Sequence, residues 1–326
     1  MARFPDPAGS PFRVRAALPL APGKFRDPAV TAGGEPRATV AMTGLATLWF
    51  NTGTLCNLAC ATCYIESSPT NDALVYLSAA EVAGYLDEIA AGRLPTQEIG
   101  LTGGEPFMNR EIIPILEDCL ARGFAVLVLT NAMRPMRRHE AALLALRARH
   151  GDRLTLRVSL DHHSRAVHEA ERGLGSWDKA MDGLRWLAVH GFRIAVAGRQ
   201  LGAETLADAR IGYAASLTRA GIALDVADPE RLVLFPEMDA GADTPEISER
   251  CWSILGKSPG SVMCASSRMV VKRRGAAAPS VAACTLLPYH PEFDLGRTLA
   301  AASRPVALNH PHCARFCVLG GASCSG

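Results

Sequence analysis

Short apolar runs alternate with amphipathic stretches of helical period from about residue 45 to residue 235. Strand-like runs lie at 47–50, 98–101, 125–129, 154–160, 193–197 and 232–235. Helical patterns lie near 79–91, 110–122, 139–150, 176–190 and 203–220. Ser78 and Glu81 form a capping-box pattern at the start of the first helix. The alternation predicts a parallel α/β fold, although it does not separate a doubly wound sheet from a partial barrel.

The pattern changes at both ends of this region. Residues 1–40 are rich in Pro, Gly and Arg and have no sustained period, so we interpret them as an N-terminal arm. After residue 235 the chain is punctuated by Pro, Gly and Cys, and a hairpin is expected over 267–272 and 280–283 around Gly275. We therefore divide the chain into the arm 1–40, a central α/β domain 41–240 and a cysteine-rich extension 241–326.

Composition narrows the class of protein. The 326 residues carry a formal charge of +2, which falls short of the basic surface of a nucleic-acid-binding protein. Apolar runs are too short for a membrane helix, and the N-terminus lacks the apolar stretch of a secretory signal. These features predict a cytoplasmic protein without nucleic-acid or membrane partners. In a reducing compartment, ten grouped cysteines indicate metal ligation rather than disulfides.

Three of the cysteines follow the first strand closely. Cys56, Cys60 and Cys63 have the spacing Cys-x3-Cys-x2-Cys, and such dense thiolate loops suit an iron–sulfur cluster. Three protein thiolates leave one iron of a [4Fe–4S] cube open to an outside ligand. A structural zinc site would instead need a fourth Cys or His nearby, and the loop contains no His. A zinc knuckle remains the alternative on spacing alone.

This loop resembles the CxxxCxxC motif of the radical S-adenosylmethionine superfamily, with Tyr64 at the aromatic position. The family's second motif, GGEP, is intact at Gly103, Gly104, Glu105 and Pro106. The resemblance implies that the cluster cleaves S-adenosylmethionine to a 5′-deoxyadenosyl radical, which removes hydrogen from a substrate. It also implies that these four residues contact the methionyl amino group. The implied fold is a partial (β/α)6 barrel of the TIM type.

Polar residues directly follow three later strand runs: Thr130 with Asn131, Ser159 with Asp161, and Arg199. Parallel α/β folds bind ligands at the carboxyl ends of their strands. The stretch from Ser159 through Arg172 is similar to the "SLDG … RG" segment of radical S-adenosylmethionine enzymes, except that His162 stands where Gly is usual. By this resemblance Ser159 and Asp161 face the cofactor, and Arg199 pairs with its carboxylate.

The C-terminal cysteines are similar to those of SPASM and twitch extensions, which bind auxiliary [4Fe–4S] clusters. The spacings are looser here, because the later pair is separated by three residues. Two fully ligated cubes need eight thiolates and only six cysteines lie in this region, so one auxiliary cluster is the economical interpretation. Its expected ligands are Cys264, Cys284, Cys313 and Cys317, with Cys324 as a substitute. A zinc-stapled tail or two incompletely ligated clusters are the alternatives.

The sequence supports several net reactions. We favour oxidative modification of a peptide or protein, with dehydrogenation or rearrangement of a small molecule such as a sugar or nucleotide as the alternative. Glu237 and Asp239, just past the sixth strand, are candidate proton acceptors. The expected partners are the substrate and a reductant such as flavodoxin or ferredoxin. A non-catalytic iron–sulfur or zinc protein is the contrasting class, and it predicts no binding of S-adenosylmethionine.

Overall fold

A curved, mainly parallel sheet forms the centre of the computed structural model, which describes residues 23–201, 204–236 and 243–322. Its strand order is β7-β6-β5-β4-β3-β2-β8-β9. The strands are β2 (Thr47–Asn51), β3 (Glu98–Thr102), β4 (Ala125–Thr130), β5 (Leu154–Ser159), β6 (Arg193–Arg199), β7 (Leu232–Phe235), β8 (Ser267–Val271) and β9 (Ser280–Ala282). All six strands predicted for the central domain are present. The described edge strands β7 and β9 do not pair, so the barrel is partial.

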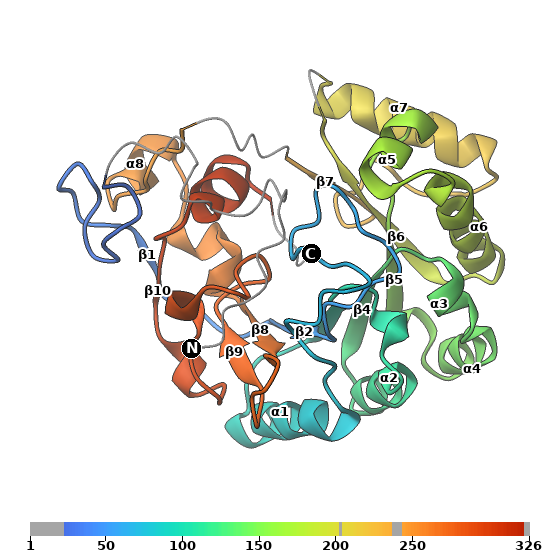
Figure 1. Ribbon diagram of the computed structural model, residues 1–326, viewed down its shortest axis with the longest axis horizontal. Coiled ribbons are helices and arrows are strands. Elements are labelled where there is room, and N and C mark those ends of the chain that lie inside the picture. Colours follow the sequence, from blue (N-terminus) through green and yellow to red (C-terminus); the bar gives the residue numbers. More distant parts are fainter. Residues whose placement is uncertain (1–22, 202–203, 237–242, 323–326) are drawn as a thin grey trace.

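The helices are α1 (Ala79–Gly92), α2 (Ile112–Ala121), α3 (Arg134–Arg137), α4 (Glu140–His150), α5 (Arg165–Arg172), α6 (Ser176–Val189), α7 (Leu206–Arg219) and α8 (Cys251–Leu255). Helices α1 to α7 cover the outer side of the sheet, and α8 lies among the C-terminal segments (Figure 1). Figure 1 shows an outer arc from α1 to α7, with the C-terminal segments, coloured orange to red, on the other side of the sheet. This layering confirms the predicted α/β class.

Local sequence explains why these elements begin where they do. Ser78 accepts a hydrogen bond from the amide of Glu81, and the Glu81 side chain accepts one from the amide of Ser78, so the predicted capping box is present. The parallel register aligns Leu48 with Ile99 and Ile99 with Val126, and all three side chains are buried. Strands covered on both faces need such continuous apolar runs. The short helices α3 and α5 were not predicted.

The predicted hairpin is present, and its first strand also joins the central sheet. β8 and β9 pair antiparallel, with Met269 opposite Ala282. β8 additionally pairs in parallel with β2, where Thr47 lies opposite Ser267. Every residue of β8 is buried. The sheet therefore continues from residues 41–240 into the cysteine-rich extension, a long-range pairing that the local pattern did not indicate.

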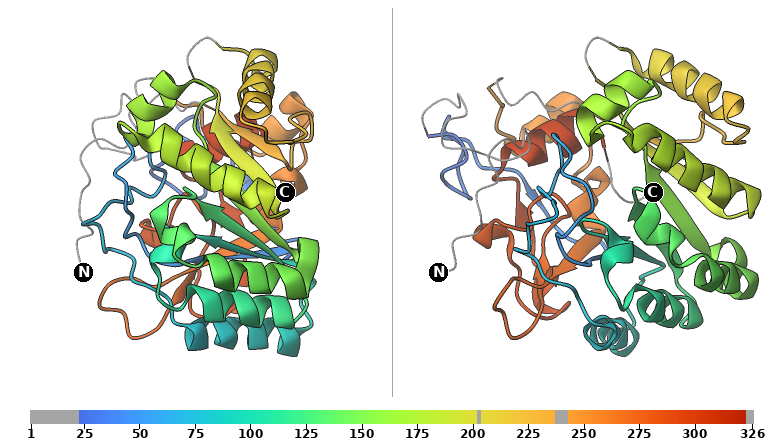
Figure 2. Two further views of the ribbon diagram at one scale, coloured as in Figure 1. Left: turned by 90° about the vertical axis from the view of Figure 1, so that its right-hand side faces the viewer. Right: turned by 45° about the vertical axis from the view of Figure 1, so that its right-hand side comes forward.

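The described part of the N-terminal arm packs against the extension. β1 (Thr39–Val40) pairs antiparallel with β10 (Val306–Ala307). Arg37 forms a buried ion pair with Glu246, whose carboxylate also accepts hydrogen bonds from the amides of Phe25 and Ala32. Figure 2 shows these N-terminal segments beside the C-terminal ones, away from α1 to α7. The described part of the arm thus contacts the extension.

Candidate active site

A cavity lies at the carboxyl ends of strands β2 to β7, where about 1030 Å³ of space, including its open mouth, is enclosed. Most of the site residues expected from sequence line it: Cys56, Cys60, Cys63, Tyr64, Gly103, Gly104, Thr130, Asn131, Ser159, Asp161 and Arg199. Residues from loops more than one hundred positions apart therefore meet at one end of the barrel.

The cysteine loop brings three thiols to this cavity. The Sγ atom of Cys56 accepts the amide of Leu58 at 3.4 Å, and that of Cys63 accepts the amide of Ser67 at 3.2 Å. Burial raises the pKa of Cys56 to about 12 and also raises that of Cys60. Buried thiols with such pKa values become thiolates only beside a cationic centre, and three sulfur donors suit a [4Fe–4S] cluster. The donor set therefore fits the cluster expected from sequence.

The paired glycines of the GGEP segment allow two loops to approach closely. A Cβ atom on Gly103, which has φ +141°, would lie 2.5 Å from the carbonyl oxygen of Gly53. A Cβ atom on Gly104 would lie 2.2 Å from that of Leu55. The Gly104 amide donates to the Gly53 carbonyl oxygen at 2.7 Å. Residues with side chains cannot occupy these positions, so the glycines fix the cysteine loop against the end of β3.

Glu105 lies beneath the cavity and does not line it. Its carboxylate accepts hydrogen bonds from the Thr130 hydroxyl and the Asn131 amide, both at 2.8 Å, and from the Phe107 amide at 3.2 Å. Burial raises the pKa of Glu105 to about 7 despite these bonds. Pro106 is buried and begins the short helix Pro106–Met108. In the structure, Glu105 therefore positions the Thr130–Asn131 turn from below.

Asp161 is held by two arginines at the cavity wall. Arg172 donates to it twice, from Nε to Oδ2 at 2.7 Å and from Nη2 to Oδ1 at 2.9 Å. The Nε atom of Arg199 lies 3.7 Å from Oδ1. Burial opposes ionisation of Asp161, but Arg172 and Arg199 outweigh it and lower its pKa. Arg172 lines the cavity and was not among the predicted site residues, although it belongs to the "RG" segment of the motif.

Arg199 also contacts the cysteine loop. Its Nη2 donates to the carbonyl oxygen of Thr62, and its guanidinium lies over the Tyr64 ring, 4.7 Å from the centroid. Tyr64 in turn packs edge-on against Phe235 and Phe316, each at 5.7 Å between ring centroids. The aromatic residue of the cysteine motif thus connects the loop to β7 and to the extension.

A second cavity, of about 360 Å³ including its mouth, lies in the extension. Four cysteines line it, and they are Cys264, Cys284, Cys313 and Cys317. Burial raises the pKa of Cys264 to about 11 and raises that of Cys313 well above its usual value. His312 shares the cavity wall, and sequence reasoning missed it. The four thiols are those predicted to hold an auxiliary cluster, and a sulfur-lined apolar cavity suits one.

Leu286 lines both cavities, and Thr285 lines the first. These residues directly follow Cys284, so one short segment separates the two groups of thiols. Cys251 lies in α8 and does not line the described second cavity. The predicted proton acceptors Glu237 and Asp239, and the substitute ligand Cys324, lie outside the described residues.

Comparison with known proteins identifies the class that this fold and site define. Residues 50–235 match the model of the Radical SAM superfamily, and the chain belongs to this family. Membership supports the predicted [4Fe–4S] cluster and S-adenosylmethionine as its cofactors. None of the described helices combines the length and apolar character needed to cross a membrane.

Several curated relatives match part of the chain, among them AlbA and MftC. The subtilosin biosynthesis protein AlbA of Bacillus subtilis is 34% identical over 143 residues, which cover 44% of this chain and 30% of AlbA. The mycofactocin maturase MftC of Mycobacterium tuberculosis is 29% identical over 137 residues, covering 42% of this chain and 33% of MftC. The matches thus span about a third of the length of these relatives.

Solved structures support the fold. SuiB of Streptococcus suis bound to S-adenosylmethionine aligns with a TM-score of 0.54 and 11% identity, over 78% of this chain and 63% of SuiB. The protein anSMEcpe with bound S-adenosylmethionine aligns with a TM-score of 0.53 and 12% identity, over 79% of this chain and 77% of that one. At these identities the similarity concerns the architecture alone.

Proposed function

We propose that this chain is a radical S-adenosylmethionine enzyme that oxidatively modifies a peptide or protein. Cys56, Cys60 and Cys63 hold the [4Fe–4S] cluster and leave one iron open. When bound there, the cluster and S-adenosylmethionine supply a 5′-deoxyadenosyl radical that abstracts hydrogen from the substrate. The observation that carries the proposal is the convergence of the cysteine loop, the paired glycines and the ends of β4 to β6 on one cavity.

The chain's own residues bind and orient the cofactor. The backbone of Gly103 and Gly104 faces the cavity and receives the methionyl group. Thr130, Asn131 and Ser159 offer polar side chains at the ends of β4 and β5, where a ribose can be hydrogen-bonded. The cationic face of Arg172 and Arg199 favours a carboxylate. These roles agree with the sequence motifs and await direct measurement.

We further propose one auxiliary [4Fe–4S] cluster on Cys264, Cys284, Cys313 and Cys317. Leu286 is shared by the two cavities, which supports a short path for an electron from the substrate side to the auxiliary site. Glu237 or Asp239 would accept the accompanying proton. A reductant such as flavodoxin or ferredoxin would recharge the first cluster. A reducing, cytoplasmic location fits the abundance of thiols.

The relatives support two kinds of substrate to different extents. AlbA and MftC are named as a bacteriocin biosynthesis protein and a maturase, which supports a peptide substrate. A 7-carboxy-7-deazaguanine synthase of Koribacter versatilis is 36% identical over 84 residues, covering 26% of this chain and 34% of that enzyme, and it supports the small-molecule alternative. A peptide that copurifies with the chain and changes mass on turnover would favour the first.

The decisive experiment is anaerobic reconstitution with iron and sulfide, followed by an iron count and an assay for 5′-deoxyadenosine after reduction. Wild type should hold about eight irons and the Cys56/Cys60/Cys63→Ala variant about four. Only wild type should release 5′-deoxyadenosine. Tightly held zinc without 5′-deoxyadenosine would instead support the non-catalytic alternative and refute the proposal.

A further inference from the structure

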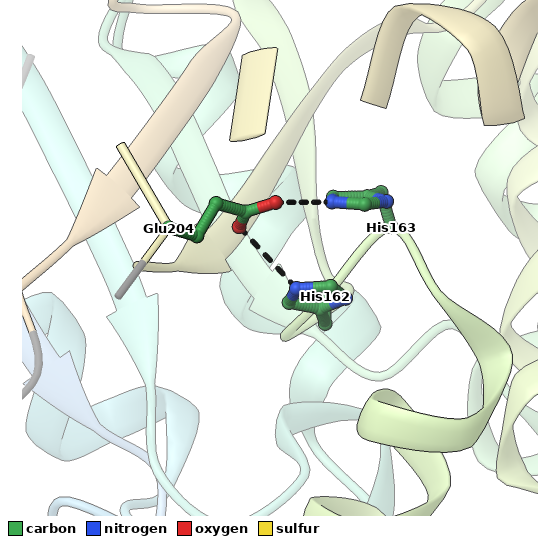
Figure 3. Close-up of side chains that lie close together, drawn as sticks. All are labelled: His162, His163 and Glu204. Atoms are coloured by element: carbon green, nitrogen blue, oxygen red, sulfur yellow. Dashed lines mark hydrogen bonds and ion pairs between the residues drawn. The ribbon is translucent and has the colours of Figure 1, made fainter. Parts of the chain in front are cut away.

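Two imidazoles and one carboxylate meet at the ends of β5 and β6, outside the residues that line either cavity. The Nε2 atom of His163 lies 2.6 Å from Oε1 of Glu204, and the Nε2 atom of His162 lies 3.3 Å from Oε2. One ligand atom from each of the three residues can be chosen so that all lie within 4.8 Å of one another. Figure 3 shows both rings directed at the same carboxylate. The three side chains therefore lie close enough together to bind the same ion.

We propose that His162, His163 and Glu204 bind one divalent transition-metal ion, such as Zn²⁺. Two imidazole nitrogens and one carboxylate form a recurrent zinc ligand set, with water completing the coordination. In a tetrahedral site of this kind, nitrogen and oxygen ligands are separated by about 3.3 Å. The His162 Nε2 atom already lies at this distance from Oε2 of Glu204, whereas His163 Nε2 lies 2.6 Å from the other oxygen, Oε1, and must move apart from it to bind an ion.

Surrounding residues hold the histidines in place. The two rings stack with centroids 4.1 Å apart. A Cβ atom on Gly212 of α7 would lie 2.4 Å from the His163 ring, so the absence of a side chain there makes room for it. Ser216 of α7 donates to the His163 carbonyl oxygen at 2.8 Å. Helix α7 therefore orients His163 before any ion arrives.

The hydrogen bonds within the cluster are incomplete. Oε2 of Glu204 is buried and accepts no hydrogen bond from the described part of the chain, because the nearby His162 nitrogen is poorly aligned with it. A buried carboxylate oxygen without a donor is unfavourable, and a cation would compensate for this. With neutral imidazoles the cluster carries the single negative charge of Glu204, which suits a divalent ion.

Metal binding requires a tautomer change in both rings. His162 Nδ1 accepts the Ser164 amide at 2.9 Å, and His163 Nε2 donates to the Glu204 carboxylate at 2.6 Å, so the proton of each neutral ring lies on Nε2. Coordination through Nε2 moves both protons to Nδ1, with no net release, and replaces these two hydrogen bonds. Three coordination bonds outweigh the two hydrogen bonds that are lost. The ion would join the segment after β5, where Asp161 lines the cavity, to the segment after β6.

Zinc binding tests this site in the reconstituted protein, whose cysteines are occupied by iron. The protein is loaded with Zn²⁺, desalted, and analysed for metal content and by zinc X-ray absorption. Wild type should retain one Zn²⁺ with nitrogen and oxygen neighbours at about 2.0–2.1 Å. Glu204→Gln should weaken Zn²⁺ binding about 100-fold or more. The matched variant His150→Ala/Glu230→Ala, which removes one half-buried imidazole and one exposed carboxylate outside the cluster, should bind as wild type does.

Thermal unfolding provides a second readout. Zn²⁺ should raise the unfolding temperature of wild type and of the matched variant, but not that of Glu204→Gln. If Glu204→Gln retains zinc equally, or if the zinc neighbours are sulfur at about 2.3 Å, the ion sits on cysteines and the proposal is wrong. Wild type that retains no zinc at all would also overturn it and leave a hydrogen-bonded cluster.

Discussion

Arg172 and Asp161 form a bidentate ion pair on the wall of the candidate active site, with N–O distances of 2.7 and 2.9 Å. The aspartate directly follows β5, and the arginine ends α5. Both side chains are largely buried. The pair lies beside the cysteine loop, because Asp161 and Arg172 line the same cavity as Cys60 and Cys63. A buried cation is thus fixed next to the predicted cluster.

Replacing Arg172 by Gln should destabilise the fold and weaken cofactor binding. The change leaves Asp161 with only the more distant Arg199, and breaking a buried ion pair by removing one partner costs about 3 kcal/mol. Denaturant unfolding and calorimetric titration with S-adenosylmethionine measure the two effects.

The exposed pair of Arg165 and Asp178 provides the matched control, since it is also bidentate but lies at the surface. Arg165→Gln should leave both quantities unchanged. Equal effects of the two substitutions would show that the buried pair has no special role.

Glu105 should make stability depend on pH. Its pKa rises from 4.5 to about 7 on folding because the carboxyl group is buried. The folded state therefore holds the proton more tightly than the unfolded state between these values, and the free energy of unfolding should fall by roughly 2–3 kcal/mol as pH rises through this range. Below pH 4.5 this contribution does not change with pH. Urea unfolding at several pH values measures it.

Glu105→Gln should flatten this part of the pH profile. It should also be less stable at low pH, because its amide cannot accept the Asn131 amide where Glu105 Oε2 does. Glu140→Gln, at the start of α4 where the carboxylate pairs with Arg137 and its side chain is 38% exposed, is the control and should preserve the wild-type slope. An unchanged slope in Glu105→Gln would assign the pH dependence to other groups.

Substitution of auxiliary-site cysteines should remove iron selectively. Cys284→Ala and Cys317→Ala each delete a thiol from the second cavity, so the reconstituted iron count should fall from about eight toward four. Release of 5′-deoxyadenosine should persist, because the first three cysteines are intact. Cys251→Ala is the control and should retain all the iron. Loss of iron in that variant alone would require a different ligand set.

Leu286→Ala should open the wall between the two cavities. Removing this buried side chain should lower the free energy of unfolding by about 2–5 kcal/mol. Leu287 is also buried but lines the second cavity only, so Leu287→Ala is the control and should lower the free energy of unfolding by a similar amount. Only Leu286→Ala should make air bleach the auxiliary cluster faster. The loss of the cluster's absorbance over time measures this rate. Matching bleaching rates in the two variants would mean that Leu286 does not act as the barrier.

Local pattern predicted the strands well because each is an uninterrupted apolar run bounded by polar residues, as at 125–129. The cysteine and glycine motifs predicted which loops meet, since the ends of parallel strands share one edge. The pairing of β8 with β2 could not be predicted, because it joins residues 220 positions apart, as Thr47 with Ser267 does.

Side chains whose roles depend on distant partners were harder to predict. Arg172 lies on a polar helix, where an arginine most often faces solvent, and only the fold shows its contact with Asp161. Glu105 was assigned to the cofactor with the rest of its motif, and the hydrogen bonds of its carboxylate to Thr130 and Asn131 became apparent only in the structure. His312 and the cluster around Glu204 could not be identified as candidate sites from sequence, because their partners come from other loops.

The parallel ladder between β2 and β8 has a consequence for electron transfer. Cys56 follows the carboxyl end of β2, and Cys264 precedes the amino end of β8, so one thiol of each group is attached to one of two neighbouring parallel strands. Hydrogen-bonded strands lie about 4.8 Å apart and resist relative motion. The separation of these two thiols is therefore set by the sheet and not by the connection between β7 and β8. That connection can vary in length and sequence while the distance between the two proposed clusters stays nearly constant.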